Sequence, residues 1–136
     1  MQRREDWQER LLAALSAHER QPFAWDESDC FRLCMDAAEA LIGHDPWHEV
    51  RGRYRTARGA ARVLRGHGCT DVAGMFALRF APVAGALARR GDIGTIEQDG
   101  EIIGCVVLGT HLVAKQPMGI VRAPREQLAQ AFKIGW

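Results

Sequence analysis

The pattern of apolar residues changes at Gly91, and this change limits the folds that the chain can adopt. Residues 91–136 contain four short segments rich in β-branched residues and separated by turn-forming residues: DIGTIEQ, EIIGCVVLG, THLVAKQ and MGIVRAP. Asp99-Gly100, between the first two segments, predicts a tight hairpin because both residue types tolerate a positive φ. We therefore predict a small antiparallel sheet over residues 91–136.

The sequence before Gly91 predicts helices instead of strands. Apolar residues recur there at helical spacing, with charged residues on the opposite faces. Ser28 or Asp26 is suited to cap the second of these helices, and Gly43 to end it. The predicted helices cover residues 5–18, within an N-terminal helical region of residues 1–20, and residues 27–42, 56–66 and 71–80.

Helices followed by antiparallel strands are typical of an α+β domain. A chain of 136 residues can form one hydrophobic core but is too short for two cores without a visible linker. We predict a single domain over residues 1–136, with N-terminal helices packed on a small C-terminal antiparallel sheet.

Composition and apolar runs exclude a membrane-embedded chain. Apolar residues make up 47% of the chain and charged residues 26%, as in a folded soluble protein. No apolar run is long enough to cross a bilayer, and the N-terminal segment carries charges on every turn. We expect neither a signal peptide nor a membrane anchor, and a protein that is made in the cytoplasm.

Positive charge is concentrated in one segment, although the formal net charge is only +1. Lys115 and Lys133 are the only lysines, and the arginines cluster in RGRYRTARGAARVLRGHG at residues 51–68. The rest of the chain is not basic and Tyr54 is the only aromatic residue in the segment, so we do not expect nucleic acid as a partner. DNA binding stays as an alternative. Our hypothesis is an acidic protein partner for four of these arginines: Arg51, Arg53, Arg55 and Arg58.

Cys30 lies near the start of a predicted helix, where backbone amides and the helix dipole favour a thiolate. The neighbouring acids Asp26, Glu27 and Asp29 disfavour a further negative charge. Cys30 can therefore be a nucleophile, a metal ligand or a small apolar residue of the core. Asp29 can either cap the helix or orient a catalytic group.

Several motifs around Cys30 occur in an order that resembles a known family. They are F-x-W-x-x-x-D-C ending at Cys30, GHDP, RGRY, ARRGDI and the final AFKIGW. Their order from Phe23 to the last residue resembles the NlpC/P60 family of papain-like cysteine peptidases. It is more closely similar to a small, divergent relative of that fold encoded beside phage tail genes.

The resemblance implies a papain-like fold with Cys30 as nucleophile, and a histidine at the start of the strand that follows the Gly-Asp strand. EIIGCVVLG has Ile102 or Ile103 at the position of that histidine. A cysteine without a base in hydrogen-bond reach is mostly protonated and has no proton donor for the leaving group. Among the remaining candidates, only His111 lies in the strand half of the chain; the other four histidines are predicted to be surface or turn residues.

Two functions follow from the resemblance. The first is a structural or assembly component of a siphophage-type tail tip or baseplate, located in the virion tail and bound to hub-like tail proteins. In that case the active site is degenerate. The alternative is an active cysteine peptidase or amidase that cuts peptidoglycan peptides or a tail protein, with Cys30 as nucleophile and His111 as base.

Two further features are left with alternatives. In papain-like folds the cysteine helix packs on the sheet, so Cys30, Cys34 and Cys105 are expected near one another, either in the core or around a soft metal. No cysteine or histidine spacing typical of zinc occurs, and we predict no metal and no cofactor. Trp136 either docks on its own sheet or anchors a neighbouring subunit.

Overall fold

The computed structural model describes residues 2–136, which form four α-helices and six strands. The helices are α1 (Trp7–Arg20), α2 (Cys30–Ile42), α3 (Ala57–Gly66) and α4 (Val72–Arg79), with 3-10 turns at His48–Val50, Gly85–Leu87 and Arg125–Gln127. The strands are β1 (Pro82–Val83), β2 (Ile93–Gln98), β3 (Glu101–Val107), β4 (His111–Gln116), β5 (Gly119–Pro124) and β6 (Gln130–Phe132). No described helix is long and apolar enough to cross a membrane.

All six strands pair antiparallel in one sheet of order β1-β6-β2-β3-β4-β5. The predicted α+β class is therefore confirmed. The Asp99-Gly100 hairpin is confirmed as well, because it joins β2 to β3 with φ values of 52° and 80°. The sheet begins earlier than predicted: Pro82–Val83 pairs with β6, although this short segment has no alternating apolar pattern.

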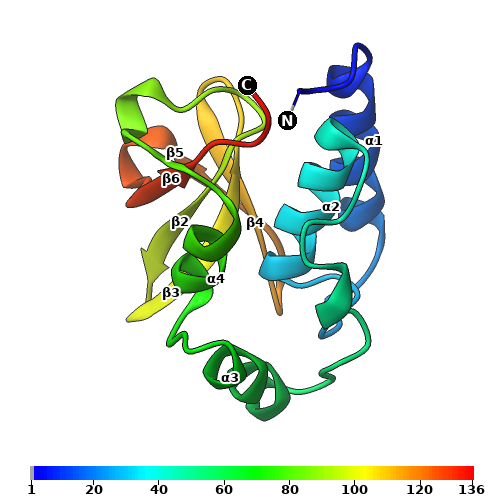
Figure 1. Ribbon diagram of the computed structural model, residues 1–136, viewed down its shortest axis with the longest axis vertical. Helices are drawn as coiled ribbons and strands as arrows, with labels where there is room; N and C mark the ends of the chain where they lie inside the picture. The colour runs from blue at the N-terminus through cyan, green and yellow to red at the C-terminus, as the bar shows by residue number, and fades with distance from the viewer. Residues whose placement is uncertain (1) are drawn as a thin grey trace.

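The helices cover one side of the sheet. In Figure 1, α1 and α2 stand together beside the sheet, α4 lies in front of it, and α3 lies at the lower end. One apolar cluster fills the space between helices and sheet, with Leu33, Phe76 and Val106 at its centre. A second cluster, which includes Ile96 and Leu112, lies on the other face of the sheet.

Helix α2 begins at Cys30, three residues later than predicted, and Asp29 caps it. The side chain of Asp29 accepts a hydrogen bond from the backbone amide of Arg32 at 2.7 Å, which satisfies one of the free amides of the first turn. The predicted caps Ser28 and Asp26 are therefore wrong. Gly43 ends the helix as predicted, in the left-handed conformation with φ 94°.

A close approach between α2 and β3 positions Cys30 against the sheet. It occurs at Gly104, where an added Cβ would lie 3.1 Å from the Cys34 sulfur and 3.4 Å from the Cys30 carbonyl oxygen. A larger residue at this strand position would push the helix away from the sheet. Gly104 therefore sets the distance between the start of α2 and the strand that it faces.

Candidate functional site

An open groove runs past Cys30, between α3 on one side and the β2–β3 hairpin and β4–β5 turn on the other. We call it the Cys30 groove; its volume is about 640 Å³ and its lining includes Trp25, Cys30, Ala60, Leu64, Ile102 and Pro117. A smaller cavity of about 70 Å³ adjoins it behind Trp25 and Cys30. Most of the lining is apolar, so the groove suits an apolar segment better than a charged one.

The Cys30 thiol lies at the base of this groove and is held in its protonated form. Burial raises its pKa to about 12; a hydrogen bond with the Gly104 backbone opposes this rise, and the charge of Asp29 adds to it. Nucleophilic cysteines have the opposite property, a lowered pKa. At neutral pH this thiol is therefore a poor nucleophile.

No imidazole faces Cys30 among the described residues. The two residues that the resemblance aligns with a histidine both line the groove: Ile102, which is 42% exposed, and Ile103, which also belongs to the cluster on the other face of the sheet. This wall of the groove is therefore aliphatic.

His111 lies at the other end of the sheet from Cys30. Its carbonyl accepts a hydrogen bond from the Leu108 amide at 2.9 Å, so His111 is level with Leu108 at the end of β3. Leu108 is four residues beyond Gly104, or roughly 13 Å along the strand. A general base must lie about 3 Å from its proton donor. The prediction of His111 as the base for Cys30 is therefore wrong in this structure.

His18 is buried, contrary to the predicted surface or turn position. Its ring nitrogens lie 2.8 Å from the Ser28 hydroxyl and 2.7 Å from the Asp36 carboxylate. This set resembles a Ser-His-Asp triad, but Ser28 and His18 are only 0% and 1% exposed, respectively. A substrate cannot reach the hydroxyl. The arrangement instead links the end of α1 to α2.

Both carboxylate oxygens of Asp29 accept hydrogen bonds that hold the surrounding backbone and Tyr54 in place. Besides capping α2, its carboxylate accepts hydrogen bonds from the Tyr54 hydroxyl at 2.7 Å and the Asp26 amide at 2.8 Å. Burial and the charge of Asp29 raise the pKa of Tyr54, which keeps that hydroxyl a donor. The capping role predicted for Asp29 is confirmed, and its carboxylate contacts no imidazole within residues 2–136.

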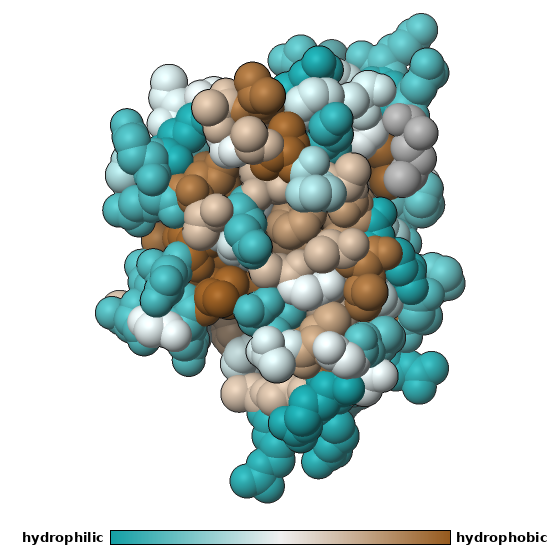
Figure 2. All heavy atoms as spheres, turned by 60° about the vertical axis from the view of Figure 1, so that its left-hand side comes forward, coloured by the Kyte–Doolittle hydropathy of each residue, from teal (hydrophilic) through white to brown (hydrophobic). Residues whose placement is uncertain are grey.

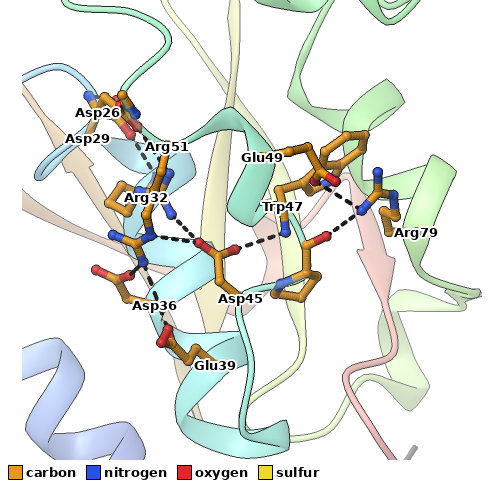
Figure 3. Close-up of polar contacts among 12 residues, drawn as sticks. Asp26, Asp29, Arg32, Asp36, Glu39, Asp45, Trp47, Glu49, Arg51 and Arg79 are labelled. Carbon is orange, nitrogen blue, oxygen red and sulfur yellow. Dashed lines mark hydrogen bonds and ion pairs between the residues drawn. The ribbon is translucent and has the colours of Figure 1, made fainter.

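A buried ion cluster holds the start of α2 to the following loop (Figure 3). We call it the Arg32 cluster, and its members are Asp26, Arg32, Asp36, Asp45 and Arg51. The guanidinium of Arg32 is 0% exposed and lies 2.7 Å from Asp45 and 3.0 Å from Asp26. Burial alone would lower its pKa, but the surrounding carboxylates outweigh this effect and raise it. Its Nε has no hydrogen-bond partner among the described residues.

The structure divides the four predicted binding arginines into two pairs. Arg51 belongs to the Arg32 cluster, with its guanidinium 3.0 Å from Asp45 and 2.9 Å from Asp36. Arg53 donates to the Glu49 carbonyl at 3.3 Å. Arg51 is therefore paired within the chain, although its side chain is 46% exposed, and its contact with an acidic partner stays a prediction. Arg55 and Arg58 are exposed and form no ion pair within the described chain.

Trp136 docks on its own chain. Its indole N–H donates to the buried carboxylate of Asp92 at 2.9 Å, and 38% of the residue stays exposed. This contact matches the first of the two predicted alternatives. The aspartate of the ARRGDI motif, Asp92, is thus the hydrogen-bond acceptor for the indole of Trp136.

Cys34 and Cys105 are buried thiols on opposite faces of the sheet. Cys34 belongs to the cluster between helices and sheet, and Cys105 to the cluster on the other face. Burial raises the pKa of both, that of Cys105 to about 12. Within residues 2–136, no group of three or more Cys, His, Asp or Glu residues is placed to hold a metal.

Family comparison identifies the chain as a member of one family. The model of DUF6950, a domain of unknown function, matches residues 2–134, so the chain belongs to the DUF6950 family. No curated protein and no solved structure matches it.

Proposed function

We propose that this protein is a catalytically inactive, NlpC/P60-like (papain-like) domain that serves as a structural or assembly component of a siphophage-type phage tail tip or baseplate. The observation that carries the loss of catalysis is the environment of Cys30: a thiol with a pKa of about 12 that faces Ile102 in place of an imidazole. The tail location and hub-like partners rest on the motif order from Phe23 to Trp136.

Two features support the papain-like part of the proposal. A cysteine begins a helix that packs on an antiparallel sheet, and an open groove passes over its sulfur. The strand after the Gly-Asp strand lies beside that sulfur, as the resemblance implies. This arrangement fits an inherited peptidase groove that now binds a segment of a partner without cutting it.

Helix α3 offers a binding surface next to the groove. None of its residues is fully buried; Ala60 and Leu64 line the groove, whereas Arg58 and Arg62 are exposed. Figure 2 shows the same contrast, with apolar atoms gathered over the middle of the face and hydrophilic atoms at the lower end, where α3 lies. A tail protein with an apolar segment flanked by acidic residues would complement both parts.

The peptidase alternative is tested by the rate of alkylation of Cys30 against pH. We expect no inflection below about pH 9 for the wild-type protein, since a thiol of ordinary pKa titrates near 8.5 and burial moves Cys30 upward. The Cys30→Ser variant is the control: any alkylation that it shows comes from the other three cysteines, so the difference from the wild type gives the rate at Cys30. An inflection below neutral pH that the serine variant lacks would show a thiolate-imidazolium pair and refute the inactive site.

The assembly role is tested by variants in the native genetic context. We expect Cys30→Ser to assemble tails normally, because no covalent step is needed. We expect Arg55→Glu with Arg58→Glu to reduce tail assembly at least about tenfold, because two interfacial charges are reversed. Tails are counted by electron microscopy and the protein is detected in purified particles by mass spectrometry. Loss of tails in the serine variant, or absence of the protein from particles, would contradict the proposal.

A further inference from the structure

A second groove lies at the end of the molecule opposite α3. The two chain ends lie near each other at the top of Figure 1, whereas α3 lies at the bottom. An open groove of about 530 Å³ is lined by residues from both ends of the chain, and we call it the termini groove. Its lining includes Arg3, Arg4, Trp7, Arg89, Arg90 and Trp136. It shares no lining residue with the Cys30 groove, so it is a separate site.

Asp92 is buried outside the lining of the termini groove and holds two of the lining residues in place, Arg3 and Trp136. The guanidinium of Arg3 lies 2.9 Å from the Asp92 carboxylate and donates to the carbonyls of Arg90 and Ile134 at 2.6 and 2.8 Å. The indole of Trp136 binds the same carboxylate. Arg3 is thereby neutralised, and its planar group is fixed 4.5 Å from the Trp7 ring centre.

Other cations at and beside this groove have no acidic partner among the described residues; Lys133 is not in the lining but contacts Trp136, which is. Arg89 lies 3.8 Å and Lys133 lies 4.4 Å from the ring centre of Trp136, so the two charges are close to each other across one indole. Neither of them, nor Arg90, forms an ion pair among the described residues. Like charges within a Debye length, about 10 Å at 0.1 M salt, repel each other.

Arg90 adds an unsatisfied donor. Its Nε is buried and has no hydrogen-bond partner among the described residues, a condition that usually carries an energetic cost. Glu5 is the one acidic side chain among the lining residues. An incoming anion would therefore relieve repulsion between cations that the protein itself leaves uncompensated.

We propose that the termini groove binds an acidic segment of a partner protein. Guanidinium groups pair with carboxylates through two parallel hydrogen bonds, and stacking on Trp136 presents the Arg89 group in a fixed plane. The exposed parts of Trp7 and Trp136 add apolar surface for side chains between the acidic residues. Nucleic acid fits less well, because the chain has a net charge of only +1.

The test uses the full chain and a short fluorescein-labelled peptide in which Glu and Leu alternate. Binding is followed by fluorescence anisotropy at low ionic strength. We expect the double variant Arg89→Glu with Lys133→Glu to weaken binding at least about tenfold, because two favourable charge contacts become repulsive. Arg89 is exposed and Lys133 is half-buried, and circular dichroism checks that the fold is retained.

The matched control is Arg58→Glu with Arg62→Glu, which changes the net charge equally but lies on α3. It should bind the peptide within about twofold of the wild type, since a distant charge is screened. Equal binding by the Arg89/Lys133 variant, or equal loss in the α3 control, would overturn the site. Tight binding of a peptide with Gln in place of Glu, or of a short DNA duplex in preference to the peptide, would also overturn it. These outcomes concern a different surface from the assembly test above.

Discussion

Replacement of Arg32 by methionine should lower the free energy of unfolding by at least about 3 kcal/mol, since removing one partner of a buried ion pair leaves an uncompensated buried charge. The side chains of Asp26 and Asp45 are only 7% and 5% exposed. Methionine keeps most of the volume of the side chain but none of its charge. Asp45 retains Arg51 at 3.0 Å, whereas Asp26 retains no cation of the cluster. Urea unfolding measures the change.

The control for this prediction is Arg62→Met, an exposed arginine on α3 without an ion pair in the described chain. It should change the free energy of unfolding by less than about 0.5 kcal/mol, as is usual for surface substitutions. Similar stabilities for the two methionine variants would mean that the Arg32 cluster contributes nothing net. A loss confined to Arg32 would show that the start of α2 depends on this cation.

The Arg32 cluster also matters for the Cys30 groove, because it holds the loop between α2 and α3. Asp26 accepts a hydrogen bond from the Gly52 amide, and Tyr54, two residues further, donates to Asp29. These contacts fix the segment that enters α3, whose apolar side forms one wall of the groove. The shape of the groove therefore depends on a group of buried charges behind it.

Helices and strands could be predicted because their signals are local. Apolar periodicity, together with residues that start or end helices, located all four helices, and the Asp99-Gly100 pair located the central hairpin. The position of Cys30 at a helix start was also local, since Asp29 next to it is a preferred cap residue. The family resemblance aligns Ile102 or Ile103 with the histidine of the peptidases, and both isoleucines line the groove; the alignment itself stays a prediction.

The polar networks could not be predicted, because each joins residues far apart in the chain. His18 meets Asp36 across two helices, and Arg51 meets Asp45 only after the loop between them turns back. Charge alone made Arg51 resemble Arg55 and Arg58, which form no ion pair within the described chain. Likewise, the register of β4 against β3 decides where His111 lies, and the sequence of β4 does not contain that register.

Replacement of Asp92 by alanine is the second change with a large expected effect, again about 3 kcal/mol or more in the free energy of unfolding. Its side chain is 0% exposed and accepts hydrogen bonds from Arg3, the Ile134 amide, the Arg89 amide and the Trp136 indole. Alanine leaves all of these donors without their acceptor and leaves the Arg3 charge, 11% exposed, without its counterion. Urea unfolding again measures the loss.

Asp6→Ala is the control, because Asp6 forms a surface pair with Arg10 in which the side chains are 47% and 50% exposed; such pairs contribute at most about 1 kcal/mol. A loss at Asp92 no larger than at Asp6 would contradict the central role of this carboxylate.

Asp92→Asn separates charge from hydrogen bonding: it should recover part of the stability, since the amide oxygen can still accept from the Ile134 amide. The same variants test how the termini groove is built. If Asp92 positions Trp136, and Trp136 in turn positions Arg89, peptide binding should fall in Asp92→Asn even under conditions where the protein remains folded.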